Sequence, residues 1–354
     1  MNTSNTTTLG PSYTAAALQL PVKAVNRCPD RASARARINE TIDNLAVRVR
    51  GTKHWAGPSL KLIVLPEYFL TSYPQQESVA EWADKAALDP DGPEYERMAR
   101  IAQDNNVFLA GNAYETDKHF PGLYFQVCFI IDPAGKVVLR YRRLNSMFAP
   151  TPHDVWDKYL DLYGLEGVFP VARTEIGNLA GIASEEILYP EIARCFAMRG
   201  AEVFFHPTSE NGSIVQTFKD VAKLARAIEN MAYVVSANTG GLLDIDLPPD
   251  AGNGASRIID FRGQVLKVAG WGETANAMAE IDLNALRRER RKPGMNNFLS
   301  RQRFDAFAAS YAAAKFQTAN ALMNPDGTVK QPERAHFADA QARTLARLSE
   351  LGLI

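Results

Sequence analysis

Segments typical of buried strands alternate with amphipathic helical segments through the first two-thirds of the chain, and this alternation constrains the fold most. Residues 62–65 form a short, continuous apolar run, as a strand buried on both faces does. Residues 31–50 carry apolar side chains at helical spacing, at Ala34, Ile38, Ile42, Leu45 and Val49. Strands that alternate with helices in this way predict a layered α/β fold.

The same patterns divide the chain into three parts. We predict a flexible N-terminus at residues 1–12, a main α/β domain at 13–292 and a helical extension at 293–354. The extension is rich in Ala, with helices expected at 298–323 and 333–351. These helices could wrap around a second subunit or pack on their own domain. Further strands are expected at 13–20, 107–114, 124–131, 136–143, 176–183, 203–206, 233–238, 256–260, 264–268 and 279–283, and further helices at 94–105, 190–199 and 218–230.

Composition excludes several classes of protein. The 354 residues have a formal net charge of −1, so there is no surplus of basic charge to attract nucleic acid or an anionic membrane. The three cysteines are far apart and show no zinc-ligand spacing, which favours a reducing, cytoplasmic location. The N-terminus has neither the basic nor the apolar region of a signal peptide. We find no apolar run of about 18 residues, so no membrane span is expected.

Ser184 lies between a segment typical of a strand, 176–183, and a segment typical of a helix, 190–199. The helix is expected to begin at Pro190, because proline is favoured in the first turn. A small hydroxyl residue at such a junction occupies the place of many hydrolytic nucleophiles, since backbone N–H groups beyond it can face a developing oxyanion. The alternative is that Ser184 is a loop or N-cap serine.

Two other strand ends carry charged side chains. Glu67 directly follows the apolar run 62–65, and functional sites in α/β sheets are built at strand ends. A solvated loop glutamate is the alternative. The strand expected at 136–143 contains Arg140, Arg142 and Arg143. Alternation within this strand favours a solvated basic face, and a site that handles an anion is the other interpretation.

Five segments, taken together, resemble the nitrilase (carbon–nitrogen hydrolase) superfamily. They occur in the order of that family and cover residues 13 to 285. They are Leu-Pro-Glu at 65–67, the basic strand at 135–143, the junction at 184–194, and the segments 198–203 and 226–230. The resemblance implies an αββα sandwich that pairs with a second subunit into a four-layer αββααββα core. It therefore implies a homodimer or a higher homo-oligomer.

The resemblance also implies a catalytic glutamate, lysine and cysteine, at positions that here carry Glu67, Arg143 and Ser184. A serine hydroxyl is a weaker nucleophile than a thiol and needs a positioned base. Three explanations remain open. The chain is a hydrolase of a small amide, nitrile or N-carbamoyl compound that uses a Glu-Arg-Ser variant of the triad, a non-catalytic member that binds a ligand or partner, or an engineered Cys-to-Ser variant of an amidase.

Strand ends that converge on one site should bring further polar side chains with them. We expect the pocket to be lined by Tyr68, Asn112, Glu185, Tyr189, His206 and Thr208. Glu185 and Glu186 are adjacent, but no His or Asp cluster accompanies them, so no metal is predicted. Neither GxGxxG nor a Walker pattern occurs, and no cofactor is predicted.

Overall fold

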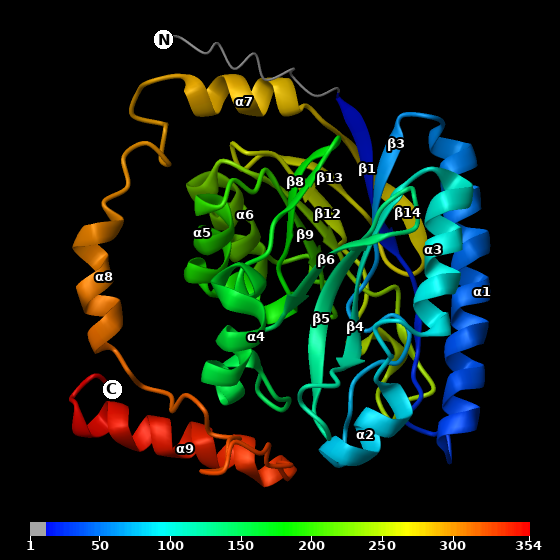
Figure 1. Ribbon diagram of the computed structural model, residues 1–354. Helices are drawn as coiled ribbons and strands as arrows, with labels where there is room; N and C mark the ends of the chain where they lie inside the picture. The colour runs from blue at the N-terminus through cyan, green and yellow to red at the C-terminus, as the bar shows by residue number, and fades with distance from the viewer. Residues whose placement is uncertain (1–11) are drawn as a thin grey trace.

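The computed structural model describes residues 12–354 (Figure 1). The flexible N-terminus predicted at residues 1–12 lies outside the described residues except for Ser12. The predicted α/β class is confirmed: two six-stranded sheets pack face to face, with helices on their outer sides. A two-stranded sheet lies beside them. This arrangement is an αββα sandwich.

The strands of each sheet are given in their spatial order. The first sheet contains β14 (Thr274–Ile281), β1 (Tyr13–Gln19), β3 (Leu60–Val64), β4 (Phe108–Thr116), β5 (Tyr124–Ile131) and β6 (Val137–Arg142). The second sheet contains β13 (Val265–Val268), β12 (Arg257–Ile259), β10 (Tyr233–Ala237), β9 (Val203–Pro207), β8 (Gly177–Gly181) and β7 (Ala172–Thr174). The small sheet pairs β11 (Leu242–Leu243) with β2 (Val22–Lys23).

Two helices cover each sheet. Figure 1 shows α1 (Arg31–Ala56) and α3 (Pro93–Asn105) on the first sheet, and α5 (Pro190–Met198) and α6 (Phe218–Asn230) on the second. The remaining helices are α2 (Val79–Ala86), α4 (Trp156–Val168), α7 (Leu283–Arg291), α8 (Phe304–Ala313) and α9 (Arg334–Glu350), with short 3₁₀ helices η1 (Pro152–Val155), η2 (Ser184–Leu188) and η3 (Pro249–Ala251).

The core follows from the two periodicities in the sequence. Along β1, Ala15 and Ala17 face the second sheet, whereas Ala16 and Leu18 face the helices, because successive side chains of a strand point to opposite sides. On α1, the apolar residues predicted to share one face are buried. That helix begins at a capping box formed by Asp30 and Ser33.

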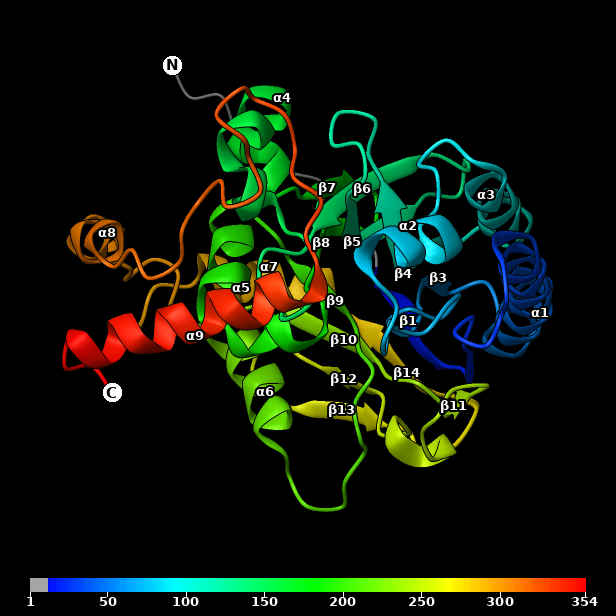
Figure 2. The ribbon, with the colours of Figure 1, turned by 90° about the horizontal axis from the view of Figure 1, so that it is seen from below.

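The C-terminal part departs from the prediction. The helix expected at 298–323 is wrong, because α8 covers only Phe304–Ala313 and has no buried residue. A helix that lacks a packed face gains little from tertiary contacts, so Ala-rich composition alone does not sustain it over 26 residues. Figures 1 and 2 show α8 standing away from the two sheets, whereas α9 contacts the body near its first turn, where Phe337 is buried. Helices α2 and α7 are absent from the predicted set.

The connections place the carboxyl ends of several strands at one edge. Strand β3 is parallel to β4, and β8 is parallel to β9, which is parallel to β10. Strand β6 is antiparallel to β5, which is antiparallel to β4, so β6 runs in the direction of β4. Within residues 12–354, the structure contains no helix that combines the length and apolar character needed to cross a membrane.

Candidate active site

Glu67, Arg143 and Ser184 meet at the carboxyl edge of the two sheets. They follow β3, β6 and β8, respectively. Arg143 Nη1 lies 3.4 Å from Glu67 Oε1. The Ser184 hydroxyl is among the hydrogen-bonding groups that lower the pKa of Glu67. Their exposed fractions are only 5%, 6% and 4%, so the three side chains form a buried polar cluster.

Ser184 has a strained backbone. Its φ is 46°, in the left-handed region that non-glycine residues seldom adopt. It is the first residue of η2, and α5 begins after it at Pro190, where the helix was predicted to begin. The turn is held at Glu186, whose buried carboxylate accepts hydrogen bonds from the backbone N–H groups of Leu144 and Asn145, each at 2.9 Å. Strain of this kind persists only where surrounding contacts enforce it, and it is concentrated at functional sites.

His206 supports Ser184 from behind. Its Nε2 lies 2.8 Å from the carbonyl oxygen of Ser184, and its Nδ1 lies 2.8 Å from the Ser236 hydroxyl. A carbonyl only accepts, so Nε2 carries the hydrogen and Nδ1 accepts from Ser236. Burial, and then the charge of Lys223, lower the pKa of His206 well below its ordinary value. The imidazole therefore stays neutral.

Arg143 is surrounded by acceptors. Besides Glu67, its guanidinium donates to the Tyr68 hydroxyl at 3.3 Å, to the Asn145 carbonyl at 2.6 Å and to the carboxylate of Glu185. Its backbone N–H donates to Gln126 and extends the β5–β6 ladder. A planar guanidinium held on several sides presents a fixed positive charge.

Burial changes the basicity of Glu67. Burial raises the pKa of Glu67 above its ordinary value, while the charges of Arg143 and Lys219 act in the opposite direction. A carboxylate whose pKa is raised toward neutrality is a better proton acceptor from a hydroxyl. The environment therefore moves Glu67 in the direction that base chemistry needs.

The six expected pocket residues occupy different places. Tyr68 stacks on Tyr114 with ring centroids 4.6 Å apart, beside Arg143. The Thr208 hydroxyl lies 3.5 Å from the Ser184 hydroxyl. Glu185 is tied to Arg143 and reaches partly into solvent. Asn112 is buried on β4, and its amide nitrogen lies 3.6 Å from Cys128 Sγ.

The remaining two expected pocket residues are Tyr189 and His206. Tyr189 is 43% exposed and lies between the end of η2 and the start of α5. His206 is fully buried, with both ring nitrogens occupied by protein groups. It therefore contacts the backbone of the Ser184 turn and leaves no free ring nitrogen for a ligand.

The solvated basic face considered for the strand at 136–143 is wrong at Arg142 and Arg143, which are both buried. Arg142 is buried, pairs with Asp117, and lies over the rings of Phe125, Tyr159 and Tyr163. Alternation suggested solvent because it cannot show that α4 and its aromatic side chains cover this edge of the sheet.

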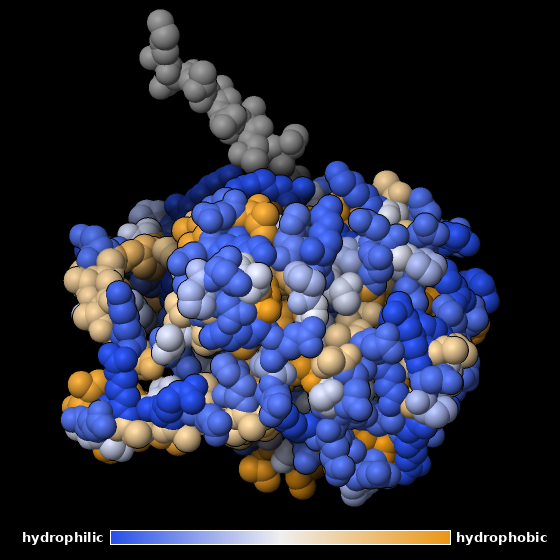
Figure 3. All heavy atoms as spheres, turned by 60° about the horizontal axis from the view of Figure 1, so that its bottom comes forward, coloured by the Kyte–Doolittle hydropathy of each residue, from blue (hydrophilic) through white to orange (hydrophobic). Residues whose placement is uncertain are grey.

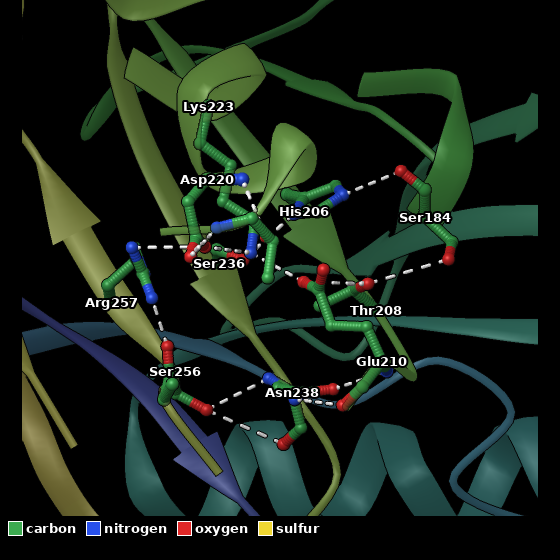
Figure 4. A network of polar contacts seen from close by, with 12 residues as sticks. Ser184, His206, Thr208, Glu210, Asp220, Lys223, Ser236, Asn238, Ser256 and Arg257 are labelled. Carbon is green, nitrogen blue, oxygen red and sulfur yellow. Dashed lines mark hydrogen bonds and ion pairs between the residues drawn. The ribbon is translucent and has the colours of Figure 1, made fainter. Parts of the chain in front are cut away.

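Sequence reasoning missed a polar cluster behind Ser184. Glu210, Asp220, Lys223 and Arg257 form a set of ion pairs next to Thr208 (Figure 4). The signal was present in part, because Glu210 comes two residues after Thr208 and Lys223 lies on the charged helix predicted at 218–230. Residues 12–354 contain no group of three or more His, Cys, Asp or Glu side chains arranged to hold a metal ion.

Comparisons with known proteins agree with this fold. The family model of carbon–nitrogen hydrolases matches residues 14–291. Formamidases of Bacillus cereus (strain Q1) and Bacillus thuringiensis (strain Al Hakam) are 28% and 27% identical to the chain over 232 residues. Each match covers 65% of this chain and 63% of the formamidase, so it spans less than two-thirds of those relatives.

Three solved structures illustrate the similarity in fold. A carbon–nitrogen hydrolase of Helicobacter pylori G27 is similar with a TM-score of 0.61 and 22% identity, over 84% of this chain and 98% of that one. Nit3 of Saccharomyces cerevisiae, a member of branch 10 of the nitrilase superfamily, is similar with a TM-score of 0.59 and 20% identity. The match covers 80% of this chain and 94% of Nit3. A cysteine-to-serine variant of an amidase of Nesterenkonia is similar with a TM-score of 0.57 and 20% identity. The match covers 84% of this chain and 97% of the amidase.

Proposed function

We propose that this chain, which belongs to the carbon–nitrogen hydrolase family, hydrolyses the carbon–nitrogen bond of a small amide. The observation that carries the proposal is the contact among Glu67, Arg143 and Ser184 at one buried edge. The formamidase and amidase names of its relatives support an amide substrate. The low exposure of the three side chains favours a small substrate over a bulky one.

Each side chain has a proposed role. Ser184 attacks the carbonyl carbon, and Glu67 accepts its proton and passes it to the leaving nitrogen. Arg143 stabilises the negative charge that develops on the carbonyl oxygen. The left-handed backbone of Ser184 and the raised pKa of Glu67 support these roles, because each is a costly feature that packing alone does not require. This is a Glu-Arg-Ser variant of the triad that the family resemblance implies.

The test is ammonia release from a panel of small amides, nitriles and N-carbamoyl compounds. Ser184→Ala should abolish release, and Glu67→Gln should reduce it by about 100-fold or more. Ser213→Ala and Glu96→Gln, on exposed side chains, serve as matched controls. An increase in intact mass that requires Ser184 would identify the acyl intermediate. Thermal stabilisation by these compounds without ammonia release would favour the non-catalytic interpretation.

We further propose that residues 13–292 form the hydrolase domain and that 293–354 act as an arm in a homodimer. Phe218 and Val221 on α6 are 71% and 53% exposed, and Phe307 on α8 is 50% exposed. Figure 3 shows apolar side chains on the part of the surface that projects from the body. Exposed apolar surface of this kind is characteristic of an interface. Phe218→Glu and Phe307→Glu should lower the oligomer mass measured by light scattering, whereas Lys118→Glu, on an exposed side chain outside α6 and the arm, should not.

A further inference from the structure

A second carboxylate is connected to Ser184 by a short chain of polar contacts. The Ser184 hydroxyl lies 3.5 Å from that of Thr208, and the Thr208 hydroxyl donates to Glu210 Oε1 at 3.3 Å (Figure 4). Thr208 is completely buried, and the Glu210 side chain is 11% exposed. The two hydroxyls and the carboxylate therefore form a path that leaves the nucleophile separately from Glu67.

The backbone holds Thr208 between the two carboxylates. Its carbonyl accepts from the N–H of Glu67 at 3.3 Å, and its own N–H donates to the carbonyl of Ala237 at 2.9 Å. Thr208 thus touches Glu67 through its main chain and Ser184 through its side chain. A hydroxyl fixed at both ends in this way has little freedom to turn elsewhere.

Glu210 is anchored more firmly than a loop residue requires. The Asn238 side chain accepts from its N–H at 2.9 Å and donates to its carbonyl at 2.7 Å. Lys223, which is 2% exposed, pairs with its carboxylate. Asp220 balances Lys223 and Arg257 at 3.4 Å and 3.0 Å, so the buried cluster has two charges of each sign. These contacts hold the Glu210 carboxylate in a buried ion pair and aim it at Thr208.

The direction of the hydrogen bonds follows from proton counting. An ionised carboxylate only accepts, so the single hydroxyl proton of Thr208 is given to Glu210. In that arrangement Thr208 can only accept from Ser184. The Ser184 proton therefore has two acceptors within reach, Thr208 and Glu67.

We propose that Thr208 and Glu210 form a second proton-transfer path for Ser184, a proposal that rests on the hydrolase function above. As the Ser184 oxygen bonds to the carbonyl carbon, its O–H bond breaks and the proton moves to Thr208. The proton of Thr208 moves at the same time to Glu210, and the π electrons of the carbonyl pass to its oxygen. When the carbon–nitrogen bond breaks, its electron pair passes to the nitrogen, Thr208 gives its proton to that nitrogen, and Glu210 returns a proton to Thr208. Glu210 is a positioning residue in this scheme, because it acts through Thr208.

The first arm of the test uses turnover. Thr208→Val and Glu210→Gln should each lower kcat by about 10-fold or more, with KM changed by less than about 3-fold. Thr208→Ser should restore most of the rate. Glu67→Gln combined with Glu210→Gln should fall to the level of Ser184→Ala. Unchanged kcat in both single variants, or equal loss in Thr208→Ser and Thr208→Val, would overturn the path.

The second arm needs no turnover. In a Ser184→Cys background, the pH dependence of alkylation by iodoacetamide reports the pKa of the introduced thiol. Glu210→Gln should lower that pKa, because a nearby negative charge that opposes the thiolate is removed. Glu96→Gln is the control. Wild-type turnover with no shift would overturn the path and leave the hydrolase function standing, whereas a shift with no wild-type turnover would support the path's geometry and refute the function.

Discussion

The imidazole of His206 donates a hydrogen bond to the carbonyl oxygen of Ser184 across 2.8 Å. This contact ties the carbonyl of the left-handed residue that begins η2 to a fully buried imidazole. It also requires a neutral imidazole with the hydrogen on Nε2, because Nδ1 accepts from Ser236. The position of the proposed nucleophile therefore depends on the protonation state of a residue that does not face the ligand.

His206→Leu should lower the free energy of unfolding by about 1–3 kcal/mol, because it removes hydrogen bonds to two buried groups, the Ser184 carbonyl and the Ser236 hydroxyl. The wild type should also lose stability as pH falls below about 6.5, since the unfolded chain binds a proton that folded His206 resists. Denaturant titrations at several pH values measure both effects. His206→Leu should flatten this pH dependence, and the exposed control His54→Gln should not; equal slopes in all three proteins would contradict the argument.

Arg143→Met should cost about 3–5 kcal/mol of stability, because it leaves the buried carboxylate of Glu67 without its cation. It should also reduce turnover by about 100-fold or more if Arg143 stabilises the oxyanion. Arg143→Lys keeps the positive charge and should therefore lose less stability and less turnover than Arg143→Met. Steady-state kinetics and thermal melts, with exposed Arg262→Met as the control, make the comparison. A lysine variant as impaired as the methionine variant would show that charge at this position is not what matters.

Lys219→Gln should shift the lower limb of the pH–rate profile toward higher pH. The charge of Lys219 lowers the pKa of Glu67, so its removal should let burial raise that pKa further. Lys267→Gln, on the exposed strand β13, carries the same change of charge far from the site and should leave the limb in place. If the lower limb of the pH–rate profile lies at the same pH in both variants, Glu67 is not the group that titrates in that limb.

Glu202→Gln should lower stability by about 2 kcal/mol at neutral pH, since Arg287 binds both carboxylate oxygens at 2.7 and 2.9 Å. Burial would raise the pKa of Glu202, but hydrogen bonds from Arg287 and the Asn178 N–H lower it below its ordinary value. A lowered pKa stabilises the fold at neutral pH, and this contribution is lost as pH falls through the folded pKa.

The difference in free energy of unfolding between wild type and Glu202→Gln should therefore become smaller in acid, at pH values below about 4. Urea titrations at neutral and acid pH test this, with exposed Glu280→Gln as the control. If this difference in free energy stays constant down to acid pH, the lower stability of Glu202→Gln comes from altered packing and not from the lost charge.

The sequence was sufficient for the layers of this fold and for the strand ends that carry the candidate site. Apolar runs and helical spacing are local properties, so β5 and α6 have the predicted bounds and α1 buries the predicted face. The positions of Glu67, Arg143 and Ser184 also follow locally, because each comes within three residues of the end of a strand. Local propensity failed at 298–323, where α8 buries none of its residues against the rest of the protein.

Tertiary structure alone decided what those side chains touch. Thr208 and Glu210 reach Ser184 only because β8 and β9 are neighbours in the second sheet, and Glu67 joins them only because the two sheets pack face to face. Arg142 is buried because α4 covers its edge of the sheet. Register between distant strands and burial by distant helices set hydrogen bonds and pKa shifts, and no local pattern in the chain encodes either.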